Sequence, residues 1–140
     1  MANAFYLTNA VVAGMLNSTG LAEALGASVK IKIYSGSVPA NADAANSGTL
    51  LATLTGPATT FASYSDTGTA SRATFGSITS ATAAATGTAA FFRIETSGGT
   101  VIAQGTVGTS SADLILNTVA ITAGSTVSIS AATVDLPEGP

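Results

Sequence analysis

The side chains best suited to catalysis in this chain are carboxylates, and they are scattered singly. They are Glu23, Asp43, Asp66, Glu95, Asp113, Asp135 and Glu138. The chain has no His and no Cys, so Ser-His-Asp and Cys-His arrangements and ordinary zinc sites are excluded. No two acids have the D-x-D spacing of a calcium loop. Two distant acids could still meet as a glycosidase couple, but solvated loop acids explain them better. We therefore expect no enzymatic activity, no cofactor and no bound metal.

The charge of the chain is low and slightly negative. The basic residues are Lys30, Lys32, Arg72 and Arg93, and the formal net charge is −3. Four basic side chains cannot form a stripe that neutralises a run of phosphates, so we expect no nucleic-acid partner. No apolar run reaches the ~18 residues of a membrane span, and the first ten residues lack the basic region of a secretory signal. We expect synthesis in the cytoplasm and no membrane partner.

Charged residues make up 8% of the sequence and hydrophobic residues 46%. Typical soluble domains carry about 25% charged residues. A surface rich in Thr, Ser and Ala is desolvated at little cost, because few ions must lose their water. This composition favours permanent contact with other protein, and we expect a homo-oligomer, either a dimer or a trimer.

Residues 88–107 are predicted to form a central β-hairpin with a turn at Ser97, Gly98 and Gly99. Hydrophobicity alternates with a period of two on both arms, as in a half-buried strand. One face of the outgoing arm carries Ala90, Phe92 and Ile94, and the same face of the return arm carries Val101, Ala103, Gly105 and Val107. We expect Phe92 and Ile94 to lie in the core.

The other face of this hairpin and a second strand supply the candidate interface residues. Phe91 is either an interface anchor or, if both faces are covered, a core residue. Arg93 and Glu95 form either an exposed same-face pair or a contact to a partner. In the strand of residues 29–34, Val29, Ile31 and Ile33 should point inward. The side chains predicted to point outward, where they are also candidate interface residues, are Lys30, Lys32 and Tyr34.

The remaining segments complete one domain, with a helical segment at residues 1–28 and a β-domain at residues 29–140. Helical spacing over residues 5–25 predicts a helix in one or two pieces, capped by Thr8 or Asn9 and ending at Gly26. Further strands are expected at residues 49–55, 58–64, 69–75, 114–121 with a bulge near Asn117, and 126–136. Residues 35–48 should form a long surface loop, residues 77–87 are ambiguous between loop and strand, and residues 137–140 should not pair.

About eight short strands separated by turn signals predict an all-β protein with two packed antiparallel sheets. A jelly-roll-like β-sandwich is the favoured topology, and an immunoglobulin-like sandwich is the alternative. The absence of Cys and Trp removes the usual landmarks of the immunoglobulin fold. No fixed repeat supports a parallel β-helix.

Three segments together resemble a known family. They are KIYSGSVPANADAANSGTLLATLT at residues 32–55, GTAAFFRIETSGGTVIAQGTVG at residues 87–108, and SADLILNTVAITAGSTVSISAATVDLP at residues 111–137. They resemble small virion structural proteins of tailed bacteriophages, and size and expected fold look like those of capsid cement, or decoration, proteins.

That resemblance implies a protein made in the host bacterial cytoplasm and located on the capsid surface of the virion. Its implied partner is the major capsid protein, whose subunits it would bridge. The resemblance implies no catalytic residues. A tail-fibre, neck or receptor-binding module of the same virion is the alternative, and it would require exposed aromatic residues around a shallow groove.

Overall fold

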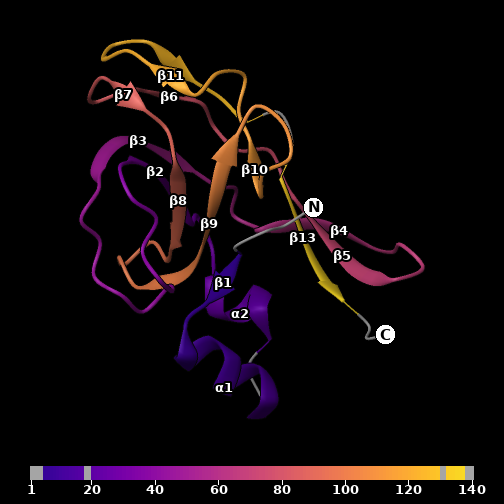
Figure 1. The fold of residues 1–140 in the computed structure, drawn as a ribbon. Helices are drawn as coiled ribbons and strands as arrows, with labels where there is room; N and C mark the ends of the chain where they lie inside the picture. Colours follow the sequence, from indigo (N-terminus) through magenta and orange to yellow (C-terminus); the bar gives the residue numbers. More distant parts are fainter. Residues whose placement is uncertain (1–4, 18–19, 130–131, 138–140) are drawn as a thin grey trace.

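The computed structural model describes residues 5–17, 20–129 and 132–137, and it is an all-β protein with two short helices (Figure 1). The elements in chain order are β1 (Tyr6–Leu7), α1 (Asn9–Asn17), α2 (Leu21–Leu25), β2 (Lys30–Ser35), β3 (Thr49–Thr55), β4 (Phe61–Asp66), β5 (Ala70–Phe75), β6 (Ala81–Thr82), β7 (Gly87–Thr88), β8 (Phe91–Glu95), β9 (Val101–Gly108), β10 (Leu114–Ile115), β11 (Ala120–Ile121), β12 (Thr126–Val127) and β13 (Thr133–Pro137). The predicted all-β class with antiparallel sheets is confirmed.

The largest sheet is built around the predicted hairpin, which is now β8 and β9. Its strand order is β1-β9-β8-β2-β3, all antiparallel, and β10 adds to β9 in parallel. Gly99 takes a φ of 96°, a left-handed value that glycine adopts without the cost of a Cβ. The backbone N–H of Gly99 donates to the Thr96 carbonyl at 3.0 Å, so the turn lies where the sequence predicts it.

One face of this sheet supplies the centre of the hydrophobic core. Phe92 pairs with Gly105 and Ile94 pairs with Ala103, so the faces of the two arms match as expected. The Phe92 ring lies directly over Gly105, where an added Cβ would come within 2.7 Å of Phe92 Cε1. Ile31 and Ile33 of β2 point the same way and are buried, as is Val29 just before the strand. The prediction that Phe92 and Ile94 are core residues is confirmed.

A second, three-stranded sheet has the order β13-β5-β4. Its β4–β5 hairpin turns at Gly68, which has a φ of 88° and donates its N–H to Asp66 Oδ1 at 2.6 Å. The rings of Phe61 and Phe75 pack edge to face at 5.0 Å between their centroids. In Figure 1 this hairpin extends to one side, away from β2, β3 and β8.

Two long predicted strands are wrong, because the chain changes sheet within each. Residues 114–121 are not one strand with a bulge at Asn117: β10 pairs with β9, whereas β11 pairs with β7. Residues 126–136 likewise divide into β12, which pairs with β6, and β13, which pairs with β5. Pro137 also pairs, opposite Ala70, so the predicted unpaired tail begins too early; residues 138–140 lie outside the described residues.

The helical segment consists of two pieces. Thr8 precedes α1 and accepts the Val12 N–H on its backbone carbonyl, but its side chain makes no capping bond. The Asn9 N–H is instead bound by Asp43 Oδ2 at 3.0 Å. Helix α2 ends at Gly26, with a φ of 71°, as predicted. Helix α1 ends at Asn17 and α2 begins at Leu21, and residues 18–19 lie outside the described part of the chain.

A jelly-roll or other sandwich topology is not confirmed. The described strands form the large sheet, the three-stranded sheet and two small two-stranded sheets, β11-β7 and β12-β6. The small sheets pair residues 81–88 with residues 120–127, and the Ala and Thr residues of 81–88 supply no large side chains to fix a long strand. The sequence left loop and strand open at residues 77–87, where the structure has the short strands β6 and β7.

Candidate functional site

The carboxylates take structural roles where the structure describes their partners. Asp43 accepts a hydrogen bond at the start of α1, Asp66 in the β4–β5 turn, and Asp113 from the backbone and hydroxyl of Thr106 at 2.8 Å each. Glu95 and Asp135 are in ion pairs. No group of three or more His, Cys, Asp or Glu that could hold a metal ion occurs among the described residues, and Glu138 lies outside them.

The six candidate interface residues are brought together as three cross-strand pairs on one face of the large sheet. Between β2 and β8 the pairs are Lys30 with Glu95, Lys32 with Arg93, and Tyr34 with Phe91. The sequence predicted that these side chains share a sheet face within each strand, and the pairing shows that the two sets also share one face. The six residues therefore lie together on one face of the sheet, but they are less exposed to solvent than the sequence predicted.

A loop of the same chain covers much of this face. We call residues 36–48 the covering loop. Phe91 is 0% exposed and stacks on Tyr34, with 5.1 Å between ring centroids, so of its two readings the structure supports core. Tyr34 is 8% exposed, so the prediction that it points into solvent is wrong. Arg93 is 5% and Glu95 6% exposed, so the alternative of an exposed pair is also wrong. The hydrophobicity of the loop has no periodicity. Its sequence therefore did not predict that it would pack onto the sheet.

Buried polar side chains bind the covering loop to the sheet. Arg93 donates from Nη2 to the Ala44 carbonyl at 2.5 Å and from Nε to Gln104 Oε1 at 3.2 Å. Gln104, opposite Arg93 on β9, donates from Nε2 to the Pro39 carbonyl at 2.7 Å. Sequence reasoning missed Gln104. The feature that could have identified Gln104 is a polar amide side chain in the middle of a strand, directly opposite Arg93 in the predicted hairpin.

The two lysines lie at the rim of this covered cluster and are half-buried. Lys32 Nζ forms an ion pair with Glu95 Oε1 at 3.0 Å, and Lys30 Nζ donates to Thr55 Oγ1 at 3.1 Å. The ion pair compensates the buried Glu95 carboxylate, which would otherwise be costly to desolvate. Both lysines therefore make contacts within the chain that stabilise this face of the sheet.

Burial raises the pKa of Tyr34 above its ordinary value of about 10, and the nearby Glu95 carboxylate raises it further. The folded protein then holds the phenol proton more tightly than the unfolded chain. Stability from this group is complete below pH ~10 and falls as the pH rises through the raised pKa. Urea unfolding of wild type and Tyr34→Phe between about pH 8 and pH 11 should show an alkaline loss that is smaller in the variant.

Tyr6→Phe is the matched control for this prediction, because it removes the hydroxyl of an exposed tyrosine. Its alkaline loss of stability should match that of wild type. Equal losses in wild type and Tyr34→Phe would contradict the prediction.

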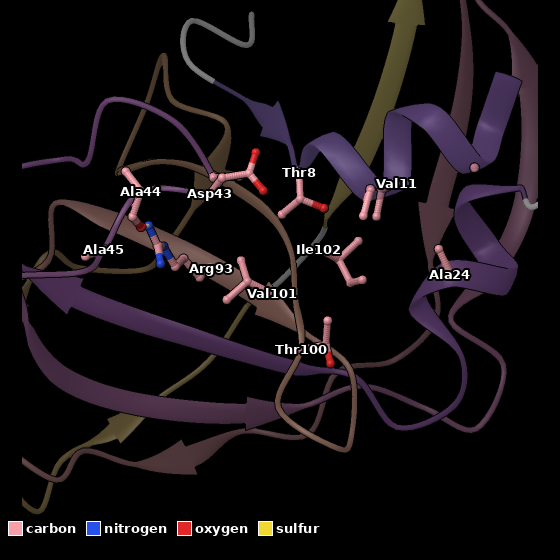
Figure 2. A pocket seen from close by; sticks show the side chains of 13 residues that line it. Thr8, Val11, Ala24, Asp43, Ala44, Ala45, Arg93, Thr100, Val101 and Ile102 are labelled. Carbon is pink, nitrogen blue, oxygen red and sulfur yellow. Dashed lines mark hydrogen bonds between the residues drawn. The ribbon is translucent and has the colours of Figure 1, made fainter.

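A cavity of about 610 Å³ lies where the covering loop meets α1 and β9 (Figure 2). Thr8, Val11, Asp43, Arg93 and Ile102 are among its lining residues. The Thr8 hydroxyl is buried and makes no hydrogen bond in the described structure, whereas Arg93 and Asp43 are engaged by Ala44 and Asn9. The described lining contains no nucleophile held by a base, so the cavity has no arrangement for covalent catalysis.

The exposed apolar side chains form the more informative surface. The large ones are Tyr6, Val12, Leu16, Val38, Leu50, Tyr64 and Leu136. Tyr6 lines a groove of about 1050 Å³ between β1, β10 and β13, and Tyr64 lines one of about 570 Å³ between the helices and β4. Helix α1 carries no charged residue, and its Leu16 is 86% exposed. Composition predicted a charge-poor surface, but not where its apolar side chains lie.

Neither helix in the described part of the chain is long and apolar enough to cross a membrane. Comparison with protein-family models, with curated proteins and with solved structures found no match.

Proposed function

We propose that the protein is a non-enzymatic structural component of a tailed-phage virion, which stabilises the capsid by bridging major capsid protein subunits as a cement, or decoration, protein. It would be made in the host cytoplasm, act as a dimer or trimer, and reside on the capsid surface. Two lines of support combine: the resemblance of the three sequence segments to such virion proteins, and the character of the exposed surface.

The observation that carries the proposal is an exposed apolar face on α1, a helix without charged residues. Leu16 and Val12 of this helix are exposed, and the whole chain has only four basic residues. Two of those, Lys32 and Arg93, are engaged with Glu95 and with the covering loop. A surface of this kind is buried against protein without stranding ions, and large exposed apolar patches commonly mark interaction sites.

The stabilising mechanism is multivalent contact. A copy that touches two capsid subunits is released only when both contacts break, so modest contacts add to a long residence time. Because the protein binds the assembled shell and not the separated subunits, binding shifts the equilibrium toward the shell. No bond is made or broken in this role.

The test compares virions assembled with and without the protein under heating and osmotic shock. Particles that lack it should release DNA at a lower temperature, and adding purified protein should restore the higher temperature. Leu16→Asp should restore it less well, because it places a charge on the exposed apolar face of α1. Asn17→Asp, which adds the same charge at the next exposed position, is the control. Unchanged particle stability without the protein would contradict the cement role.

A receptor-binding, neck or tail-fibre module is the second candidate, favoured by two exposed tyrosines beside grooves. Tyr6 and Tyr64 line the two apolar grooves, and such amphipathic rings suit stacking on sugars or on a partner. Labelling the protein on intact virions separates the candidates: signal over the capsid lattice supports cement, whereas signal at the neck or tail tip supports the module.

A further inference from the structure

Strand β4 is an open edge of the three-stranded sheet. In the described residues no strand pairs with its outer side, and residues 62–66 are all exposed. The Thr67 N–H donates to the Ala70 carbonyl at 2.9 Å across the hairpin. Since main-chain groups alternate in direction along an antiparallel strand, Ser63 and Ser65 bond toward β5. Tyr64 and Asp66 therefore direct their N–H and C=O groups outward.

This edge has few of the features that usually prevent strand pairing. Such features are charged side chains, above all lysines, together with prolines and bulges on the edge strand, and β4 has one charged residue, Asp66, at its end. The β4 bulge lies between Phe61 and Ser63, so residues 63–66 are regular and contain neither Lys nor Pro. The opposite edge, β13, carries Asp135 and ends at Pro137. At the outer edge of the large sheet, β3 already accepts backbone hydrogen bonds on Leu51 and Thr55.

We propose that two copies of the chain pair through β4, as antiparallel strands about a two-fold axis at Ser65. Ser65 then lies opposite Ser65 of the partner subunit, and Tyr64 lies opposite Asp66 of the partner subunit. The two three-stranded sheets become one continuous sheet. This inference rests on the proposed role as an assembly protein and names the contact between its copies.

The register follows from the outward groups. It matches Tyr64 with Asp66 in both directions, so that the outward N–H and C=O groups of both residues are paired by four hydrogen bonds. The serines meet at the close, non-hydrogen-bonded position, where small side chains fit. The two Asp66 carboxylates are not directly opposite each other, which avoids the like-charge contact that destabilises cross-strand pairs. The Tyr64 ring, 69% exposed in the single chain, gains a neighbour across the axis.

Cysteine cross-linking tests the register directly, because the chain contains no other cysteine. At the proposed axis the two residues 65 have Cα atoms about 4.5 Å apart, within the range that a disulfide spans. In the same register the two residues 63 are roughly 13 Å apart, since they are offset by four residues. Ser65→Cys should form a covalent dimer under mild oxidation at low micromolar protein, and Ser63→Cys should not.

A second variant tests the hydrogen bonds without requiring a cross-link. Tyr64→Pro removes an outward N–H and leaves the bonds to β5 in place, since proline is tolerated on an edge strand. It should weaken dimerisation at least about tenfold in sedimentation velocity, because two hydrogen bonds per dimer are lost. Circular dichroism checks that the variant is folded. If Tyr64→Pro is unfolded, the cysteine pair alone decides.

A wild-type dimer with selective Ser65→Cys cross-linking supports the proposal. A wild-type monomer or trimer, or equal cross-linking of the two cysteine variants, overturns it. These measurements use purified protein and no capsids, whereas the shell role is tested on virions. Failure of the β4 contact therefore leaves the particle result intact, and failure of the shell role leaves the dimer result intact.

Discussion

Phe92→Ala is expected to lower the free energy of unfolding by about 3–5 kcal/mol, through lost transfer energy and the cavity left behind. The Phe92 side chain is 3% exposed, lies over Gly105 and faces the Phe5 ring at 6.3 Å between centroids. Its neighbours on the sheet are held by main-chain bonds to strands on both sides, so they cannot close the cavity easily. Urea or guanidinium denaturation measures the loss.

Leu16→Ala is the control for this prediction, because it truncates an 86% exposed side chain and keeps a good helix former. It should change stability by no more than about 0.5 kcal/mol. If Phe92→Ala cost as little as Leu16→Ala, the core could not be centred on β8 and β9.

Arg93→Met is expected to lower the free energy of unfolding by about 2–6 kcal/mol, because two acceptors lose a donor at about 1–3 kcal/mol each. These acceptors are the Ala44 carbonyl and Gln104 Oε1. The loss of the Ala44 bond also releases one attachment of the covering loop. Limited proteolysis should therefore cleave residues 36–48 faster in the variant than in wild type.

Arg72→Met makes the same substitution at an exposed arginine. Arg72 forms a two-pronged pair with Asp135, at 2.7 Å for each hydrogen bond, on the surface of the three-stranded sheet. Water and salt screen such a pair, so the loss should be much smaller than for Arg93→Met. Equal losses for the two variants, or unchanged proteolysis of the covering loop, would show that Arg93 does not bind the loop.

The ion pair between Arg72 and Asp135 also makes the stability of the protein depend on pH. Its hydrogen bond and charge lower the pKa of Asp135, so the folded state favours the ionised carboxylate. The contribution is present above the ordinary Asp pKa of about 3.9 and is lost as the pH falls through the lowered value. In Arg72→Met this loss of stability at low pH should disappear, because Asp135 no longer has its cationic partner.

Local periodicity predicted the parts of the fold that depend on one strand at a time. Alternation identified Ile31, Phe92 and Ile94 as core, because a strand buried on one face places every second side chain inside. Glycines in sequence contexts that demand positive φ located the turns at Gly68 and Gly99. These features need only residues that are neighbours in the chain.

The candidate site depends on contacts between distant segments, and its burial could not be read from the sequence. Alternation shows that Phe91 and Arg93 share a face, but not that residues 36–48 fold over it. A parity shift, such as that near Asn117, has two physical origins, a bulge within one strand or a passage between two sheets. Only the partners of each half, β9 and β7, distinguish them.

The pairing of β1 with β9 also constrains the order in which the chain can fold. Tyr6 aligns with Gln104 and Leu7 with Ala103, so residues made early during synthesis find their partners only after most of the chain exists. The β2–β3 hairpin is local and can form first, but the other edge of β2 stays unpaired until β8 has been made. Closing such distant pairs is slow, on the order of milliseconds to seconds for β-rich domains. Until these pairs form, apolar strands of the nascent chain are exposed and can associate with other copies. High-level synthesis should therefore require chaperones.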